Sequence, residues 1–280
     1  MPFDDTDKLL LDAFSRQLHV ALENIFLHKE ALEKQRIDRD IEVAGTIQQK
    51  IIPEQLPTIS GYDIAGVNIP TRMVGGDYYD CIPLKDNRYA LVIADVSGKG
   101  VPAALLVSSL NASLSAYLEI DITLSELALR LNKVIYNAST EDKYITFFIA
   151  VLDPHKGELE CLNAGHNPIY LMDINGSIKE LAEGGIPFGM LGMDFPYNSQ
   201  KVALNPGESV LLYTDGVTEA MNHKEDQYDD VRPLTDFYRT HRDLPAARFI
   251  HLLMEDIDDF TGSTPQSDDI TALYLKRSET

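Results

Sequence analysis

Hydrophobic residues recur every seven positions in the first part of the chain, where proline and glycine are almost absent before residue 52. The repeat is carried by Leu11, Leu18, Ile25 and Leu32, with Phe14 and Ala21 at the alternate positions. A seven-residue repeat is typical of a helix that pairs with another helix in a coiled coil. It predicts a helical linker over residues 1–55, ending near Pro53 and Pro57, that forms a homodimer. The alternative is an amphipathic helix that folds onto its own domain.

After Pro57 the pattern changes to short segments rich in β-branched and aromatic residues, with turn residues between them, which predicts strands. The predicted strands are Tyr62–Asn68, Tyr89–Asp95, Thr146–Asp153, Glu158–Asn163, Ile169–Asp173, Ser209–Thr214 and Ile270–Leu275. The loops at 153–157 and 173–176 have the composition of hairpin turns.

Helices interrupt these strands. Residues 102–117 begin with proline and are rich in alanine and leucine, as the start of a helix favours. Residues 123–137 open with a capping box, in which Thr123 caps the helix and Glu126 is the third helical position. A further helical region lies within 233–260. This order of elements predicts an α+β domain over residues 56–280.

Acidic residues outnumber basic ones by 44 to 24, which gives a net charge of −20. Such a surface repels nucleic-acid phosphates and anionic lipids, so neither nucleic acid nor membrane is expected as a partner. No apolar run of the roughly 18–20 residues that span a bilayer is apparent, and the acidic N-terminus is unlike a signal peptide. Two cysteines make no disulfide framework in a chain of 280 residues. We therefore expect a cytoplasmic protein.

Carboxylates stand at strand ends or glycine turns in four separate segments: Asp77, Asp95, Asp215 and the pair Asp268–Asp269. Carboxylates brought together from four segments would repel one another unless cations lay between them, and hard divalent cations prefer oxygen ligands. A pair of such metals can activate a water molecule. Each motif alone is weak evidence, because Asp-Gly is mostly a turn signal.

The ordered set of motifs is specific. It reads Gly-Gly-Asp-Tyr-Tyr-Asp at 75–80, Asp-Val-Ser-Gly-Lys-Gly-Val-Pro-Ala-Ala at 95–104, Ala-Gly-His-Asn-Pro at 164–168, Thr-Asp-Gly-Val-Thr-Glu-Ala at 214–220 and Asp-Asp-Ile-Thr at 268–271. From about residue 40 to the C-terminus the chain resembles the SpoIIE/RsbU-type branch of the metal-dependent serine/threonine phosphatases (PPM). The resemblance implies an αββα sandwich, with two stacked antiparallel β-sheets flanked by helices, and two Mn²⁺ or Mg²⁺ ions.

The resemblance also implies roles for single residues. The family's bridging aspartate matches Asp95, and the ligand carbonyl after it belongs to Val96. Asp77 matches a carboxylate on the side of the second metal, whereas Asp215 and Asp268 match ligands of the first; Asp269 is the alternative to Asp268. The implied reaction is hydrolysis of phosphoserine or phosphothreonine by a metal-activated water. The implied substrate is a phosphorylated STAS-type anti-anti-sigma protein of a partner-switching pathway.

Other residues leave alternatives open. His166 either donates a proton to the leaving oxygen or holds the turn at 165–168, and the structural role is favoured. We expect Lys99 to be a solvated loop lysine rather than a phosphate ligand. Tyr78 and Tyr79 are expected to be packing residues. Residues 3–33 resemble the last helix of a GAF-type sensor domain, and we hypothesise that this helix signals to the helices at 102–117 and 123–137.

Two other classes of function remain for comparison. A non-catalytic adaptor with a degenerate phosphatase fold would have lost some of the four aspartates, and all are present. A metal-dependent nuclease also uses carboxylate-bound metals, but a net charge of −20 disfavours it.

Overall fold

The computed structural model describes residues 4–193 and 195–279. The chain divides into two units, residues 1–44 and 45–280. The predicted boundary after residue 55 stays a prediction. Residue 3 of the GAF-like segment lies outside the described residues.

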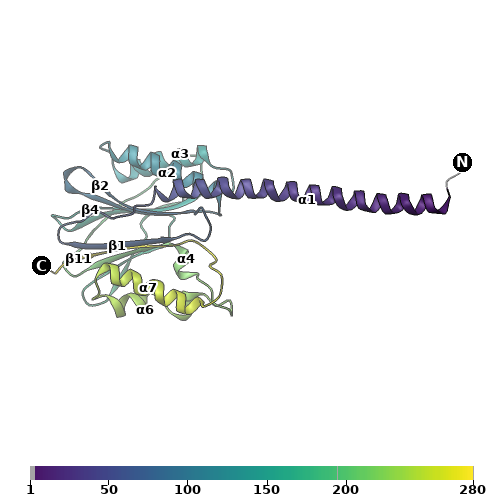
Figure 1. The fold of residues 1–280 in the computed structure, drawn as a ribbon. Helices are drawn as coiled ribbons and strands as arrows, with labels where there is room; N and C mark the ends of the chain where they lie inside the picture. The colour runs from purple at the N-terminus through teal and green to yellow at the C-terminus, as the bar shows by residue number, and fades with distance from the viewer. Residues whose placement is uncertain (1–3, 194, 280) are drawn as a thin grey trace. The chain divides into compact units, whose positions relative to one another are not determined.

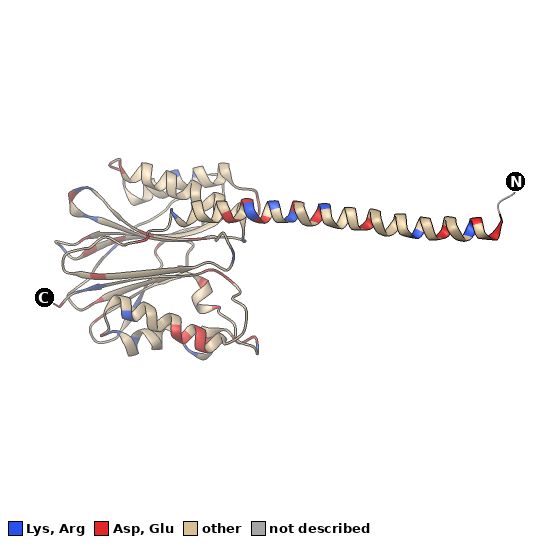
Figure 2. Cartoon of the chain, in the orientation of Figure 1, with Lys and Arg blue, Asp and Glu red and all other residues tan. Residues whose placement is uncertain are grey.

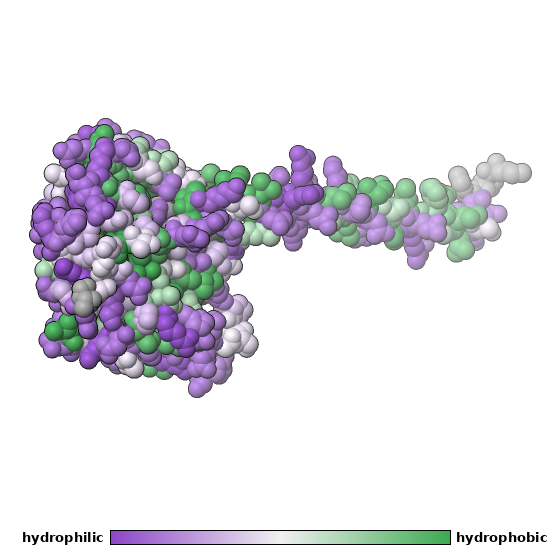
Figure 3. Space-filling view, turned by 60° about the vertical axis from the view of Figure 1, so that its left-hand side comes forward, coloured by the Kyte–Doolittle hydropathy of each residue, from purple (hydrophilic) through white to green (hydrophobic). Residues whose placement is uncertain are grey.

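A single helix, α1 (Asp5–Gln49), forms most of the predicted linker and ends before Pro53, as expected. Basic and acidic residues are interspersed along it (Figure 2). Hydrophobic side chains are exposed over its length (Figure 3), among them Leu11, Leu18, Ile25 and Leu32 of the heptad repeat. In the part of residues 1–44 that the structure describes, no other residue of this unit buries the apolar side chains of the repeat.

Two β-sheets stack in residues 45–280 (Figure 1). The first contains, in spatial order, β1 (Tyr62–Ile69), β11 (Ile270–Arg277), β10 (Ser209–Tyr213), β6 (Ile169–Met172) and β7 (Ile178–Leu181). The second contains β2 (Asp77–Pro83), β3 (Tyr89–Val96), β4 (Ile145–Asp153), β5 (Glu158–Ala164) and β8 (Gly184–Gly185), with β9 (Gln200–Ala203) also paired to β5. We name them the β11 sheet and the β3 sheet.

Helices cover the outer faces of both sheets (Figure 1). The β3 sheet is covered by α2 (Val101–Leu118) and α3 (Leu124–Ala138), and the β11 sheet by α6 (Leu234–His241) and α7 (Ala246–Thr261). The shorter elements are α4 (Asp215–Thr218), α5 (Tyr228–Val231) and the 3-10 helix η1 (Lys85–Asn87). The predicted αββα sandwich is confirmed.

Alternation along the strands builds the layers. In β3, Leu91 and Ile93 face the core between the two sheets, whereas Ala90, Val92 and Ala94 face α2 and α3. A strand presents successive side chains to opposite faces, so a central strand covered on both sides is apolar throughout. The buried apolar layers fix where each strand ends, and the strand ends position the candidate site.

Some expectations were incomplete. The sequence pattern did not identify β2, β7, β8 or β9. The sheets are not wholly antiparallel, because β8 pairs with β5 in parallel. Gly184 and Gly185 pair with Asn163 and Ala164 of β5. Only glycine allows this close contact, because a Cβ on Gly184 would lie 1.8 Å from the Asn163 carbonyl oxygen.

The expectation that no segment reaches membrane-spanning length was wrong for α2. Among the described residues, this helix of 18 residues is long and apolar enough, by length and composition, to cross a membrane. One face of α2 packs against α3 and the β3 sheet. The buried residues of the helix are Ala103, Ala104, Leu106, Val107, Leu110 and Leu114. The apolar composition of α2 is thus accounted for by packing on one face.

The capping box of α3 gives a stability prediction. The Thr123 hydroxyl accepts a hydrogen bond from the Glu126 amide at 3.2 Å, as predicted. Thr123→Ala should lower the free energy of unfolding by about 1 kcal/mol, because a helix-end amide loses its acceptor. Urea denaturation measures this change. Thr123→Ser keeps the hydroxyl and should stay within a few tenths of wild type; equal losses in both variants would contradict the capping role.

Candidate active site

Asp77 and Asp95 face each other across the pairing of β2 with β3. Asp77 opens β2, and Asp95 is the second-last residue of β3, so both stand at one end of the β3 sheet. The charge of Asp95 acts on Asp77 across this pair. Strand register holds these two carboxylates together.

The other predicted aspartates stand at the same end of the β11 sheet. Asp215 follows β10 after one residue and begins α4, while Asp268 and Asp269 immediately precede β11, the neighbour of β10. The charges of Asp215, Asp268 and Asp269 all act on Asp95. The structure therefore brings together the carboxylates that the sequence singled out.

Burial and mutual repulsion make these carboxylates hard to ionise. The pKa of Asp77 is raised well above its usual range, mainly by burial and next by the charge of Asp95. Burial, followed by the charges of Asp215 and Asp268, raises the pKa of Asp95 to about 7. Burial also raises the pKa of Asp215, with Glu219 and Asp268 adding to it. The negative charge at this end exceeds what local donors neutralise, as expected where cations bind.

Two buried threonines hold Asp77, and the sequence analysis missed both. The Thr271 hydroxyl donates to Asp77 Oδ2 at 2.6 Å, and the Thr214 hydroxyl donates to the same atom at 2.7 Å. Thr214 immediately precedes Asp215, and Thr271 closes the Asp-Asp-Ile-Thr motif. Their positions inside the motifs were the signal that could have identified them.

Asp268 and Asp269 have different partners. Asp269 is 5% exposed, and its oxygens accept hydrogen bonds from the Thr71 amide, the Thr71 hydroxyl and the Gly76 amide at 2.7–2.8 Å. Asp268 is more exposed, and its Oδ2 lies 2.9 Å from Lys99 Nζ. Because Asp269 is already saturated by donors, this arrangement favours Asp268 as the carboxylate available to a cation.

Lys99 is an exposed lysine in the loop after β3, as expected, and it also has partners there. Its ammonium pairs with Asp268 and donates to the Ser267 carbonyl oxygen, and its side chain is 34% exposed. Lys99 therefore supplies a partly exposed positive charge beside the candidate site.

The donor set fits a hard metal ion by its chemistry. A Cβ on Gly76 would lie 3.1 Å from the Val96 carbonyl oxygen, so the glycine keeps space open beside that predicted ligand. Within residues 4–193 and 195–279, however, no three His, Cys, Asp or Glu side chains are grouped to hold a metal ion by themselves. In the structure, threonine hydroxyls are the partners of Asp77, and a lysine is a partner of Asp268.

His166 takes the structural role. Its Nε2 lies 3.0 Å from the Tyr213 carbonyl oxygen, which can only accept, so Nε2 carries the proton. Nδ1 then accepts from the Thr146 hydroxyl at 2.8 Å. Both ring nitrogens are engaged in a buried position, and burial lowers the pKa of His166 to about 4. Neither nitrogen is free for proton transfer to a substrate.

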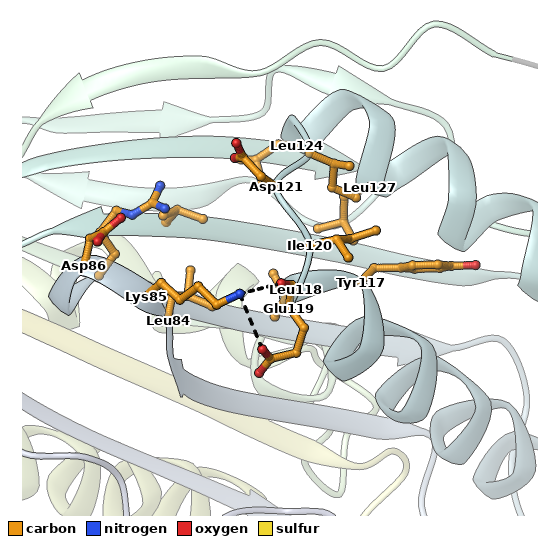
Figure 4. Close-up of a pocket in the computed structure, with 13 residues that line it drawn as sticks. Leu84, Lys85, Asp86, Tyr117, Leu118, Glu119, Ile120, Asp121, Leu124 and Leu127 are labelled. Atoms are coloured by element: carbon orange, nitrogen blue, oxygen red, sulfur yellow. Dashed lines mark hydrogen bonds and ion pairs between the residues drawn. The ribbon is translucent and has the colours of Figure 1, made fainter.

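Tyr78 and Tyr79 are buried packing residues, as expected. A cavity of about 330 Å³ lies beside the connection from α2 to α3 (Figure 4). It contains no predicted metal ligand, and Lys85 on its wall donates to the Glu119 carbonyl oxygen at 2.7 Å. It lies beside residues at the start of β3, whereas Asp95 stands at the opposite end of that strand, so it is separate from the candidate site.

The neutral, buried state of His166 predicts a pH dependence of stability. Its pKa is about 4 in the fold and about 6.5 unfolded, so the unfolded chain binds the extra proton as the pH falls from 6.5 towards 4. Between pH 7 and pH 5 the wild type should therefore lose about 2 kcal/mol more than His166→Gln. Urea denaturation of both proteins at these pH values measures the difference. The carboxylates titrate in both, so parallel losses would contradict the assignment.

Comparison with known proteins identifies the family. The family model described as stage II sporulation protein E (SpoIIE) matches residues 85–278. Phosphoserine phosphatase RsbU of Bacillus subtilis is 30% identical over 187 residues, covering 66% of this chain and 55% of RsbU. Phosphoserine phosphatase RsbP of the same organism is 25% identical over 235 residues, covering 82% and 56% of the two chains. The chain thus spans about half the length of these curated relatives.

Solved structures agree on the fold. The SiaA-PP2C domain of Pseudomonas aeruginosa superposes with a TM-score of 0.74 at 23% identity, covering 87% of this chain and 98% of that one. A structure of RsbU and RsbW domains from Mycobacterium tuberculosis gives a TM-score of 0.66 at 27% identity, covering 82% and 63%. The match over residues 85–278 includes the motifs of Asp95, Asp215 and Asp268, and the chain therefore belongs to the SpoIIE family.

Proposed function

We propose that this chain hydrolyses phosphoserine or phosphothreonine on a signalling protein, with two Mn²⁺ or Mg²⁺ ions as cofactors. The observation that carries the proposal is the gathering of Asp77, Asp95, Asp215 and Asp268 at one end of the two sheets, with more negative charge than local donors neutralise. The names of RsbU and RsbP as phosphoserine phosphatases support the same reaction.

Each aspartate has a separate proposed role in holding the ions. Asp95 would bridge the two ions with the Val96 carbonyl beside it, Asp77 would serve the second ion, and Asp215 and Asp268 the first. When bound, the ions supply a water of lowered pKa and neutralise charge on the phosphoryl oxygens. The chain's own part is to fix these oxygens on strand ends, with hydroxyls holding Asp77 and glycine backbone leaving space at Gly76.

We propose a phosphorylated STAS-domain protein of a partner-switching pathway as the substrate and the cytoplasm as the place of action. The net charge of −20 favours a basic docking patch on that substrate and disfavours nucleic acid. The similar structure from Mycobacterium tuberculosis contains an RsbU and an RsbW domain in one protein, which agrees with this proposal. A non-catalytic adaptor is disfavoured, because it would have no use for four carboxylates that repel one another at one end of the sheets.

The reaction is tested by phosphate release from a phosphoserine STAS protein in Mn²⁺. Asp95→Asn should lower the rate by about 10²- to 10³-fold, the loss typical when one group that supports transition-state charge stabilisation is removed. Asp86→Asn is the matched control. Asp86 sits at the other end of the β2–β3 hairpin with a φ of 59°, which asparagine tolerates, so its rate should equal wild type.

Chelation of the metal by EDTA should abolish phosphate release, and added Mn²⁺ should restore it. Full activity of Asp95→Asn, or turnover that persists in EDTA, would contradict the proposed reaction. Binding of Mn²⁺ without hydrolysis of any phosphoprotein would favour the adaptor, and cleavage of nucleic acid would favour the nuclease.

We further propose that α1 dimerises the chain as a parallel coiled coil. The heptad positions Leu11, Leu18, Ile25 and Leu32 are between 49% and 63% exposed, an apolar seam that a second copy would bury. Large apolar side chains off the seam are also exposed between residues 9 and 27, namely Leu9, Leu10, Val20, Leu22, Phe26 and Leu27. This wider apolar surface supports the proposal that the segment ends a sensor domain, which would cover the remaining faces.

The seam predicts which substitutions dissociate the dimer. Leu18→Glu places a charge in the seam and should convert the dimer to a monomer, because burying an unpaired carboxylate is costly. Val20→Glu makes the same chemical change at a position off the seam, 55% exposed, and should leave the dimer intact. Light scattering after size-exclusion chromatography measures both masses. A wild-type monomer, or equal dissociation by both variants, would refute the coiled coil.

A further inference from the structure

A glutamine in the last turn of α1 is clamped to the backbone beside the candidate site. Gln48 is 8% exposed, and its Nε2 donates to the Gly75 carbonyl oxygen at 2.7 Å. The Gly75 amide in turn donates to Gln48 Oε1 at 3.0 Å. One side-chain amide therefore satisfies both polar groups of a single buried backbone residue, 27 positions along the chain.

The clamp depends on a close approach of helix and loop. A Cβ on Gly45 would lie 2.1 Å from the Met73 carbonyl oxygen, so only glycine lets the helix backbone reach this loop. Gly45 and Gln48 are on adjacent turns of the same helix face, because residues three apart lie together. Residues 45–49 of α1 belong to the same unit as the loop. The end of the helix and the loop are thus one packed structure.

The clamped loop contacts three parts of the candidate site. The Gly76 amide donates to Asp269 Oδ2 at 2.7 Å, and the Gly76 carbonyl oxygen accepts from the Val96 amide at 3.2 Å. The next residue, Asp77, opens β2. A displacement of Gly75 would therefore move Asp77, the peptide group of Val96 and the anchor of Asp269 together.

Gly75 and Gly76 have no side chains that could hold this part of the loop in place. A Cβ on Gly75 would lie 2.6 Å from Asp269 Oδ2, so the close contact with that carboxylate requires glycine. Two consecutive glycines have the greatest backbone freedom of any pair. An external group has to restrict that freedom, and Gln48 is the side chain that hydrogen-bonds to Gly75 on both its donor and its acceptor.

We propose that Gln48 is a positioning residue of the metal centre, which fixes the Gly75–Gly76 backbone and through it Asp77 and the Val96 carbonyl. The proposal rests on the function proposed above, because it assigns Gln48 to the metal-binding residues of that reaction. Groups that hold metal ligands in place typically change metal affinity 10- to 100-fold when they are removed. Gln48 contacts neither substrate nor metal, so its effect should fall on metal affinity.

The test compares adjacent glutamines in the full chain. Gln48→Met keeps the length of the side chain but removes both hydrogen bonds, and Mn²⁺ affinity measured by calorimetry should fall about 10- to 100-fold. Gln49→Met is the matched control, because Gln49 is exposed and should leave the affinity unchanged. Hydrogen exchange should show faster exchange of the Gly75 amide in Gln48→Met alone, with the amides of β3 still protected.

Activity provides a second readout. In Gln48→Met the Mn²⁺ concentration for half-maximal activity should rise by the same factor, and kcat at saturating Mn²⁺ should return close to wild type. If Gln48→Met does not fold, Gln48→Asn serves in its place, because its amide is one methylene too short to reach both groups of Gly75. It should weaken Mn²⁺ binding in the same direction.

Wild-type Mn²⁺ affinity in a folded Gln48 variant would overturn the proposal, as would an equal loss in Gln49→Met. A low kcat that saturating Mn²⁺ does not restore would also overturn it. The proposed function fails separately: a wild type that binds Mn²⁺ but hydrolyses no phosphoprotein refutes the reaction, while the comparison of metal affinities still tests Gln48.

Discussion

Crowding of buried carboxylates at the common end of two sheets is the constraint on which this structure depends. Strand register places Asp77 opposite Asp95, and the apolar layers on both sides keep those strands from separating. The carboxylates cannot move apart, so protons, hydrogen bonds from hydroxyls or bound cations must reduce the repulsion between their charges. This explains why Thr214 and Thr271 are fully buried beneath Asp77, and why a lysine reaches the site from the loop after β3.

Close approach of backbone is the second requirement, and glycine meets it where the motifs need it. A Cβ on Gly216 would lie 1.9 Å from the Asp269 carbonyl oxygen. Glycine at this position therefore allows the start of α4 to pack against the start of β11. Gly76 does the same beside the Val96 carbonyl. The carboxylates can therefore come together only because these positions are glycines. The need for a turn does not by itself explain them.

Local patterns in the sequence predicted an α+β domain with aspartates at its strand ends, whereas the αββα sandwich was implied by the resemblance that the ordered motifs carry. The seven strands predicted from segments rich in β-branched and aromatic residues agree with the structure to within one or two residues, and the motifs lie where those strands end. The sequence pattern missed β2, which begins with an aspartate directly after two glycines. It also left Asp268 and Asp269 undecided. The partner that distinguishes them, Thr71, lies 198 residues away, and only the folded chain brings it to Asp269.

The carboxylates of the site fall into two physical kinds, and the difference bears on how a cation could enter. Asp269 is buried and its carboxylate accepts three hydrogen bonds, so a movement of this carboxylate would leave several donors unpaired. Asp268 is partly exposed, accepts a hydrogen bond from the Asp269 amide at 2.9 Å and pairs with the partly exposed Lys99, and such exposed ion pairs contribute little. A doubly charged ion should therefore displace Lys99 easily and leave Asp269 in place. The site is then rigid where the strands and the Gly75 loop meet, and exchangeable at Asp268, which is the more exposed of the two carboxylates.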